Sequence, residues 1–208
     1  MKRYLTKTPR LIQRIFKNYT WRFSGKHKEI YLTFDDGPTP EITEWTLDIL
    51  KKHNAKATFF CLGKNTIKAP HIYKRIRKEN HQIGNHTHTH KNGFTTSTET
   101  YISNVLEAEK HLHNPAKLFR PPYGRIRKEQ ARRLRTLGYN IFMWDVLSAD
   151  FDNAISKEKC LQNVLRNTKN GSIVVFHDST KAAEKLHYAL PRVLTHFTKQ
   201  GYVFKKIS

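Results

Sequence analysis

From residue 29 to the end of the chain, short apolar segments alternate with longer segments in which charged residues are frequent. The short segments are rich in β-branched and aromatic residues, as buried strands are. They comprise residues 29–34, 57–62, 82–85, 118–120, 139–146, 172–177 and 202–207. Strands and helices that alternate in this way form a parallel sheet or a barrel. We therefore expect one α/β domain with about seven parallel strands.

The longer segments carry apolar residues three and four positions apart, which is the spacing of an amphipathic helix. Three such sets are Ile42, Trp45, Leu47 and Leu50; Ile102, Val105, Leu106 and Leu112; and Leu186, Leu190, Val193, Leu194 and Phe197. Residues 39–41 (TPE) are of the types that begin a helix. Gly138, Gly171 and Gly201 each precede a predicted strand, where a glycine that ends a helix is expected.

Length and composition exclude several classes of protein. A chain of 208 residues forms one domain of ordinary size, and an apolar fraction of 38% is sufficient for a core. No apolar run approaches the ~20 residues of a membrane-spanning helix. Cys61 and Cys160 are far apart and lack a metal-binding spacing. We therefore expect buried thiols, not a disulfide framework or a zinc-thiolate finger.

Charge is strongly unbalanced, because 38 Lys and Arg residues against 17 Asp and Glu residues give a formal net charge of +21. Such a surface favours an anionic partner, although a solvated basic surface explains it equally well. Residues 1–28 form a basic arm with nine Lys and Arg residues and no acidic residue. The predicted domain then occupies residues 29–208.

Two interpretations are open for residues 9–17 (PRLIQRIFK) of this arm. The segment forms a short basic helix that lies on a membrane surface, or, as is more common, its apolar side chains pack against the domain. These side chains are Leu11, Ile12, Ile15 and Phe16. The basic start is not followed by the apolar core of a secretory signal. We therefore expect a cytoplasmic protein, or one that is peripheral to a membrane and contacts it through residues 1–24.

The acidic residues indicate where a site lies. Six of the seven Asp residues fall in three short segments at the predicted carboxyl ends of strands. They are Asp35 and Asp36; Asp145, Asp150 and Asp152; and Asp178. The Glu residues, by contrast, are scattered among the predicted helices. Active sites of α/β sheets and barrels lie at the carboxyl ends of the strands, so this clustering predicts an active site there.

Two of the patterns suit a metal ion. Asp35 and Asp36 end the first strand before a sharp Gly-Pro turn, so that one carboxylate can bind a metal while the other faces a substrate. His86 and His90 are four positions apart, which would place both on one face of a helical turn. The alternatives without function are an ordinary Asp-rich turn for Asp35 and Asp36, and a spacing that arises by chance for His86 and His90. His88, between the two, is expected to be an exposed bystander.

A donor set of Asp36, His86 and His90 leaves positions open for water and substrate on Zn²⁺ or a similar ion. In the loop 119–124 (FRPPYG), two prolines and a glycine hold Arg120 and the backbone N–H of Tyr123 in place. A fixed N–H is a candidate oxyanion donor, although a simple turn with an incidental Arg is the alternative.

His177 ends an apolar strand, where a His needs a partner such as a carboxylate, and Asp150 is a plausible one. An isolated case would more often be a satisfied core histidine.

Taken together and in this order, the five segments resemble the catalytic domain of the polysaccharide deacetylases, also called the NodB-homology domain or carbohydrate esterase family 4. The motifs are TFDDGP, HTHTH, RPPYG, the Asp-aromatic segment at 150–151 and the strand that ends in His177 and Asp178. The similarity covers residues 29–207. It implies a distorted (β/α) barrel with fewer than eight strands, in a single catalytic domain that follows the basic arm.

The resemblance assigns Asp36, His86 and His90 to one divalent metal ion, with Zn²⁺ as the first choice and Co, Ni or Mn as alternatives. It makes Asp35 the general base that takes a proton from the attacking water, and Arg120 the residue that holds Asp35 in place. An ordinary Asp, with a pKa of ~3.9, is too weak to deprotonate free water but adequate for a water that a metal acidifies.

The same resemblance makes the Tyr123 N–H an oxyanion donor and His177 the general acid, oriented by Asp150, because the leaving amine needs a proton. It also implies a small pocket for the acetyl methyl group. The pocket residues would be Phe151, Val175 and Pro122. The family usually has Trp at the position of Phe151 and often Asp at that of Leu147, so we expect a pocket of different size or acyl preference.

The expected function is the metal-dependent removal of N-acetyl groups from amino sugars of a glycan or glycan precursor. The partner would be a glycan or glycolipid, and the net charge leans toward an anionic one. One alternative is the same fold acting on a non-sugar amide or an O-acetyl ester. Another is a basic protein with an inactive site that binds nucleic acid or a membrane. No nucleic-acid-binding module is recognisable, so a specific nucleic-acid partner is not expected.

Overall fold

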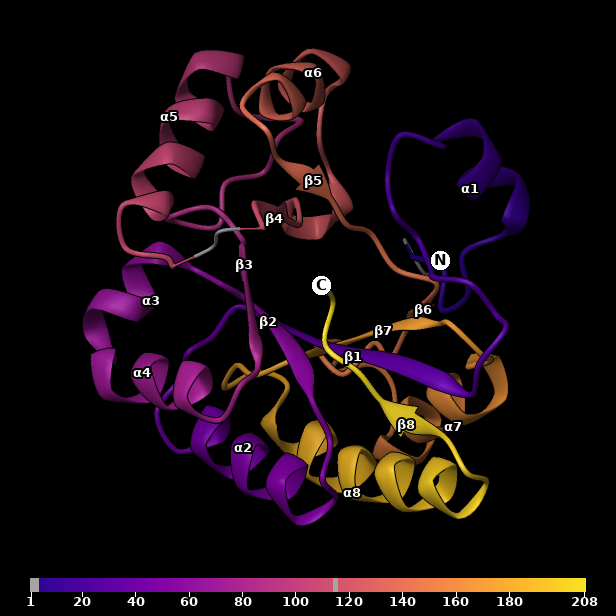
Figure 1. The fold of residues 1–208 in the computed structure, drawn as a ribbon. Helices are drawn as coiled ribbons and strands as arrows, with labels where there is room; N and C mark the ends of the chain where they lie inside the picture. The colour runs from indigo at the N-terminus through magenta and orange to yellow at the C-terminus, as the bar shows by residue number, and fades with distance from the viewer. Residues whose placement is uncertain (1–3, 114–115) are drawn as a thin grey trace.

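Seven parallel strands form a continuous sheet that curves into a half-barrel, with helices around it (Figure 1). The computed structural model describes residues 4–113 and 116–208. Along the sheet the order is β5 (Asn140–Ile141), β4 (Leu118–Phe119), β3 (Gln82–Asn85), β2 (Ala57–Cys61), β1 (Glu29–Asp35), β7 (Ile173–His177) and β6 (Val146–Leu147). A further strand, β8 (Val203–Phe204), pairs with the first residues of β1. The expected α/β fold, a distorted (β/α) barrel with about seven parallel strands, is confirmed, and it takes the form of a half-barrel.

Helices connect the strands, as the alternating pattern predicts. They are α1 (Arg10–Ile15), α2 (Ile42–Lys52), α3 (Gly63–Lys68), α4 (Pro70–Lys78), α5 (Thr98–Glu109), α6 (Lys128–Thr136), α7 (Lys157–Asn167) and α8 (Ala183–Lys199). A 3-10 turn, η1 (Pro122–Gly124), follows β4. Gly138 and Gly201 follow the C-cap residues of α6 and α8 with φ of 85° and 78°, as glycines that end helices do.

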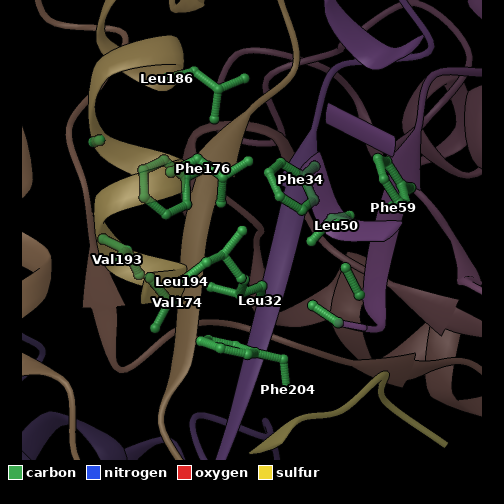
Figure 2. Packing of buried hydrophobic residues seen from close by; sticks show 14 of the residues in the cluster. Leu32, Phe34, Leu50, Phe59, Val174, Phe176, Leu186, Val193, Leu194 and Phe204 are labelled. Atoms are coloured by element: carbon green, nitrogen blue, oxygen red, sulfur yellow. The ribbon is translucent and has the colours of Figure 1, made fainter. Parts of the chain in front are cut away.

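The main core lies between the central strands and the helices α2, α7 and α8. Leu32 and Phe34 of β1 pack beside Phe176 of β7, and side chains of α8 such as Leu194 cover them (Figure 2). Because successive side chains of a strand alternate, Thr33 and Asp35 point to the other face of β1. That face is also buried, so β1 carries its polar side chains inside the half-barrel. Cys61 and Cys160 are buried free thiols.

One predicted strand, 139–146, is two strands at opposite ends of the sheet. β5 pairs with β4 and β6 pairs with β7, so residues 142–145 cross from one end to the other. The prediction of one strand was wrong because apolar composition does not record which neighbour each residue pairs with. The crossing leaves backbone carbonyls of Phe142 and Met143 inside the protein, where Arg120 donates to both (3.4 and 3.0 Å).

The basic arm pairs with the domain through its backbone. Lys7 forms an antiparallel bridge with Val146, and Arg22 forms one with Ser172. Between them, the Thr20 N–H donates to the Ile141 carbonyl (2.9 Å), and the Met143 N–H donates to the Thr20 carbonyl (2.8 Å). The arm therefore occupies the gap between the two ends of the sheet. Residues 1–3 lie outside the described residues.

The expectation that the apolar side chains of residues 9–17 pack against the domain was wrong for Leu11, Ile15 and Phe16, whereas Ile12 is half-buried. The predicted helix is present as α1, but none of its residues is buried. Leu11 and Ile15 are 67% and 65% exposed, and Phe16, directly after the helix, is 50% exposed. Strand-like pairing of the segments on both sides of α1 holds the arm, so the helix itself has no need of core contacts. In the described part of the chain, no helix has the length and apolar character to cross a membrane.

Candidate active site

A cleft of about 510 Å³ opens where the carboxyl ends of β1, β3 and β7 meet. Many residues that the sequence singles out line it: Asp35, Asp36, His86, His90, Tyr123, Phe151, Val175 and His177. Arg120 and Asp150 are fully buried behind this lining. Segments that are more than a hundred residues apart thus supply one site, as the clustering of Asp residues predicts.

Asp36, His86 and His90 bring three potential metal ligands together. Oδ1 of Asp36 is 3.2 Å from Nε2 of His90 and 3.7 Å from Nε2 of His86. Two ligand atoms of a tetrahedral zinc, each about 2.1 Å from the ion, are about 3.4 Å apart. Oδ1 of Asp36 is buried without a hydrogen-bond partner in the described chain, a condition that a bound cation removes. The three residues therefore fit a divalent metal.

His86 is prepared for this role by its surroundings. Burial lowers the pKa of His86 to about 4, so the ring is neutral at physiological pH. Its Nδ1 lies 2.7 Å from the carbonyl oxygen of Arg120 and donates to it, which leaves the lone pair on Nε2 facing Asp36. A ligating His is commonly oriented by such a second hydrogen bond. The pKa of Asp36 lies well below its ordinary value: burial acts to raise it, but the close contact with His90 and the charge of His177 lower it.

The two histidines are not on a helical turn, contrary to the expectation from their spacing. They lie in a loop after β3, in which Thr87 and His90 have φ of 69° and 58°. Side-chain amides hold this loop: Oδ1 of Asn85 accepts from the Thr87 N–H (2.8 Å), and Oδ1 of Asn104 accepts from the His88 N–H (3.0 Å). These bonds replace helical ones and still bring His86 and His90 together. His88 is half-buried, not exposed as expected, and lies outside the ligand group.

Asp35 is held by a buried ion pair. Nη1 of Arg120 donates to Oδ1 of Asp35 (2.8 Å) and to the hydroxyl of Thr33 (2.6 Å). The guanidinium also lies over the ring of Phe60, 4.1 Å from its centroid. A Cβ on Gly84 would come within 2.4 Å of that ring, so glycine is needed there. Arg120 therefore fixes the position of the carboxylate, as the sequence analysis expects.

The turn that carries Asp36 is fixed by residues to which sequence reasoning assigned no role. The Gly37 N–H donates to Oδ1 of Asp178 (3.0 Å), and the Thr43 hydroxyl donates to Oδ2 (2.5 Å). Asn65 donates to the Asp36 carbonyl (2.7 Å). Burial raises the pKa of Asp178 to about 8. A Cβ on Gly37 would lie 1.9 Å from Asp178. The position of Asp178 after a strand was the available signal for this positioning role.

His177 and Asp150 form the expected pair. Asp150 accepts two hydrogen bonds from His177, one from the backbone N–H (2.7 Å) and one from Nδ1 (2.8 Å). Burial acts to lower the pKa of His177, but the Asp150 charge and hydrogen bond, with the charges of Asp36 and Asp35, raise it to about 10. The imidazole is therefore protonated at neutral pH, with Nε2 available to donate a proton.

A carboxylate held by an arginine, three residues that could hold a metal ion and a protonated histidine thus share one cleft. The sequence profile of the polysaccharide deacetylases matches residues 24–142 of this chain. The chain belongs to the polysaccharide deacetylase family.

Known polysaccharide deacetylases resemble the chain in sequence and in fold. A peptidoglycan-N-acetylglucosamine deacetylase of Bacillus cereus is 40% identical over 78% of this chain. The alignment covers 61% of that relative, so the chain spans less than two thirds of its length. A crystal structure of the Bc1960 peptidoglycan N-acetylglucosamine deacetylase, in complex with a substituted N-oxidanyl-benzamide, has a TM-score of 0.87. That structure is 33% identical, and the match covers 96% of this chain and 95% of Bc1960.

A third polysaccharide deacetylase relative shows that the family fold also occurs without activity. BA3943 of Bacillus anthracis is described as a pseudoenzyme of carbohydrate esterase family 4. It is 29% identical to this chain, with a TM-score of 0.77 and coverage of 90% of this chain and 66% of BA3943. Membership of the polysaccharide deacetylase family therefore does not by itself establish activity, which depends on the residues of the site.

The cleft wall of this family member differs from expectation at one proline. Phe151 and Val175 line the cleft, but Pro122 does not, and Pro121 takes its place. Both prolines are buried. Pro121, two residues after β4, has an extended backbone, and Pro122 follows it as the first residue of η1. Leu147 also lines the cleft.

Tyr123 lies in η1 with a φ of 60°. Its hydroxyl is 3.1 Å from Nδ1 of His90, and its ring is mostly exposed. Its side chain thus contacts the ring of His90, which the sequence did not indicate. The role of its backbone N–H as an oxyanion donor stays a prediction.

The basic arm adds a residue to the cleft that the sequence did not indicate. Tyr4 lines it, packs its ring edge-on against Phe151 (5.4 Å between centroids) and donates a hydrogen bond to Asp152. Phe151 in turn contacts the ring of His177 (5.1 Å). No local pattern at Tyr4 signals this contact, because the partners are nearly 150 positions away in the chain.

Proposed function

We propose that the chain is a metal-dependent deacetylase that removes the N-acetyl group from N-acetylglucosamine in peptidoglycan. The observation that carries the proposal is the unpartnered Oδ1 of Asp36 beside His86 and His90, in the same cleft as Asp35 and His177. The substrate follows the two polysaccharide deacetylases named above that act on this sugar. Arg125 and Lys181 on the cleft suit a polymer that carries carboxylates.

Asp36, His86 and His90 would hold one divalent ion, with Zn²⁺ the best match to two imidazoles and a carboxylate. When bound, such an ion supplies a positive charge that polarises the acyl oxygen and makes a water molecule more acidic. Because the pKa of His86 is about 4, the ion does not have to displace a proton from this ring at neutral pH.

Asp35 acts as the general base and accepts a proton from the water that attacks the acetyl carbon. Arg120 leaves the carboxylate little freedom, because its Nη1 holds Oδ1 at 2.8 Å and is itself bonded to Thr33. A fixed base lowers the entropic part of the barrier.

His177 acts as the general acid and donates the proton of Nε2 to the leaving amine, since an amide anion is too basic to leave. The raised pKa of His177 keeps this proton in place at neutral pH, and Asp150 keeps the ring oriented through Nδ1. The acetyl methyl group would occupy the apolar part of the cleft, beside Leu147, Phe151 and Val175.

Removal of a metal ligand tests the proposal. We expect Asp36→Ala to lose the bound metal and to release no acetate from N-acetylglucosamine oligomers or purified peptidoglycan, while its circular dichroism spectrum is unchanged. Metal content is measured by inductively coupled plasma mass spectrometry. Asp48 is an exposed carboxylate on α2, so Asp48→Ala is the matched control. It should retain both the bound metal and the release of acetate. Equal acetate release by Asp36→Ala, or none by the metal-loaded wild type, would overturn the proposal.

The pH above which activity is lost tests whether His177 is the general acid. A general acid works only while it is protonated, so kcat should fall as the pH rises through the pKa of His177, which is about 10. Asp150→Asn removes the charge that raises this pKa, so the limit should move to lower pH, by about two units. The measurement is a pH profile of kcat, with Asp48→Asn as the control. An alkaline limit that stays in place in Asp150→Asn would contradict the assignment of His177.

A further inference from the structure

The arm carries an exposed surface that the catalytic site does not use. We call it the α1 patch, and it consists of Arg10, Leu11, Arg14, Ile15, Phe16, Lys17, Tyr19 and Trp21. Figure 1 shows α1 projecting beside the N-terminus, away from α2 and α8. It therefore lies apart from the main core that these two helices cover.

Its apolar side chains are exposed far beyond what a surface helix normally shows. Leu11 and Ile15 are 67% and 65% exposed, and their spacing of four places them on one face of α1. Phe16, the C-cap that follows Ile15, is 50% exposed. Single exposed apolar residues are ordinary, but adjacent large ones mark an interaction surface.

Aromatic rings extend the same surface. Phe16 and Tyr19 are stacked almost parallel, with 6.1 Å between ring centroids, and Tyr19 lies 6.4 Å from Trp21. Nε1 of Trp21 donates to the Phe16 carbonyl (3.1 Å), which closes the turn after α1. Trp and Tyr, with an apolar ring and a polar end, are the residues that prefer the boundary between water and lipid.

The cations of the patch lack acidic partners. Arg10, Arg14 and Lys17 follow one another at helical spacing, and none forms an ion pair within residues 4–113 and 116–208. With Arg22 they line a shallow hollow of about 530 Å³, which Tyr19 and Trp21 also border. Positive charge beside exposed apolar groups is complementary to a surface that is anionic outside and apolar beneath.

The exposed apolar side chains and the unpaired cations together indicate which kind of partner the α1 patch binds. A nucleic acid or an acidic polysaccharide would use the charges but would leave Leu11 and Ile15 in water. An anionic phospholipid bilayer uses both, because its headgroups pair with Arg and Lys while apolar side chains enter the boundary with the acyl chains. We propose that the α1 patch binds the surface of an anionic phospholipid bilayer.

The arm holds this patch rigidly to the catalytic fold. On one side of α1 the Thr8 N–H donates to the Asp145 carbonyl (2.9 Å), and on the other Thr20 is paired with Ile141 and Met143. Tyr4 of the same arm lines the cleft. A bilayer that binds the α1 patch would therefore set the orientation of the active site relative to the membrane.

The test is co-sedimentation of the full chain with lipid vesicles. One set consists of phosphatidylcholine with about one third phosphatidylglycerol, and the other of phosphatidylcholine alone. We expect binding to the anionic vesicles that weakens steeply with salt. Each basic residue near such a surface changes the affinity by about fivefold, so Arg10→Gln/Arg14→Gln/Lys17→Gln should bind about 100-fold more weakly. Leu11→Ser/Ile15→Ser/Phe16→Ser should lose at least about tenfold.

The matched control is Lys51→Gln/Lys52→Gln/Lys199→Gln, which removes the same charge from exposed positions on α2 and α8. It should bind like the wild type, and all three variants should deacetylate a soluble oligosaccharide at the wild-type rate. Equal loss in the control would assign binding to net charge and overturn the proposal. Retention by either α1 variant would also overturn it. A third result would overturn the proposal as well. In that result the protein binds an oligonucleotide and no vesicles, and the binding requires the α1 cations but not the apolar residues.

Discussion

Asp35→Asn is expected to lower kcat for acetate release by about 10²- to 10⁴-fold, the usual contribution of a general base. The amide has nearly the shape of the carboxylate and can still accept from Arg120 through Oδ1, the atom that is 2.8 Å from Nη1. It cannot take up a proton from water at neutral pH. The loss should therefore appear in kcat, while the metal content and the affinity for a substrate analogue stay near the wild-type values.

The comparison is made at a temperature at which circular dichroism shows both proteins folded. Asp48→Asn, an exposed carboxylate on α2 that pairs with Arg75, serves as the control for loss of one negative charge. A folded, metal-loaded Asp35→Asn that keeps more than about a tenth of the wild-type kcat would contradict the assignment of Asp35 as the base.

Arg120→Met is expected to lower the free energy of unfolding by about 3–5 kcal/mol, as the loss of one partner from a buried ion pair does. Asp35 would lose its counterion, and the carbonyl groups of Phe142 and Met143 would lose their donor. Urea unfolding, followed by circular dichroism, measures the change. A decrease of less than about 1 kcal/mol would show that water replaces the guanidinium and would contradict the buried-pair interpretation.

The double variant Asp35→Asn/Arg120→Met separates the charge from the packing. It contains no unpaired buried charge at these two positions. Its decrease in the free energy of unfolding should therefore be smaller than the sum of the decreases in the two single variants. A coupling of this sign identifies the ion pair itself as the source of the stability. Additive effects would instead assign the loss to the shape of the Arg120 side chain and to its contact with Phe60.

The sequence predicted those parts of the fold that short-range patterns encode. The apolar segments at 29–34, 57–62, 82–85 and 172–177 correspond to β1, β2, β3 and β7. Each of these strands is buried along almost its whole length, and a fully buried strand needs continuous apolar residues. The Asp residues at strand ends indicated the site for the same reason, since few functions other than chemistry justify a carboxylate beside a buried strand.

The features that the sequence did not predict depend on distant contacts. The loop of His86 and His90 has the residue spacing of a helix, but amides of Asn85 and Asn104 determine its shape. Residues 139–146 look like one strand because their composition is uniformly apolar. Tyr4 lies on the cleft because its arm pairs with a crossing segment about 140 residues later.

The pairing of the arm also has a consequence for the order of events during synthesis. Lys7 donates to the carbonyl of Asn167, 160 positions later, and bridges to Val146. At a translation rate of about 5–20 residues per second, the ribosome makes the partners of Lys7 roughly seven to thirty seconds after Lys7 itself. During that interval the exposed leucine, isoleucine and phenylalanine of the arm accompany a nascent chain whose half-barrel is incomplete. A chaperone therefore has time to bind the arm before the partners of Lys7 have been made.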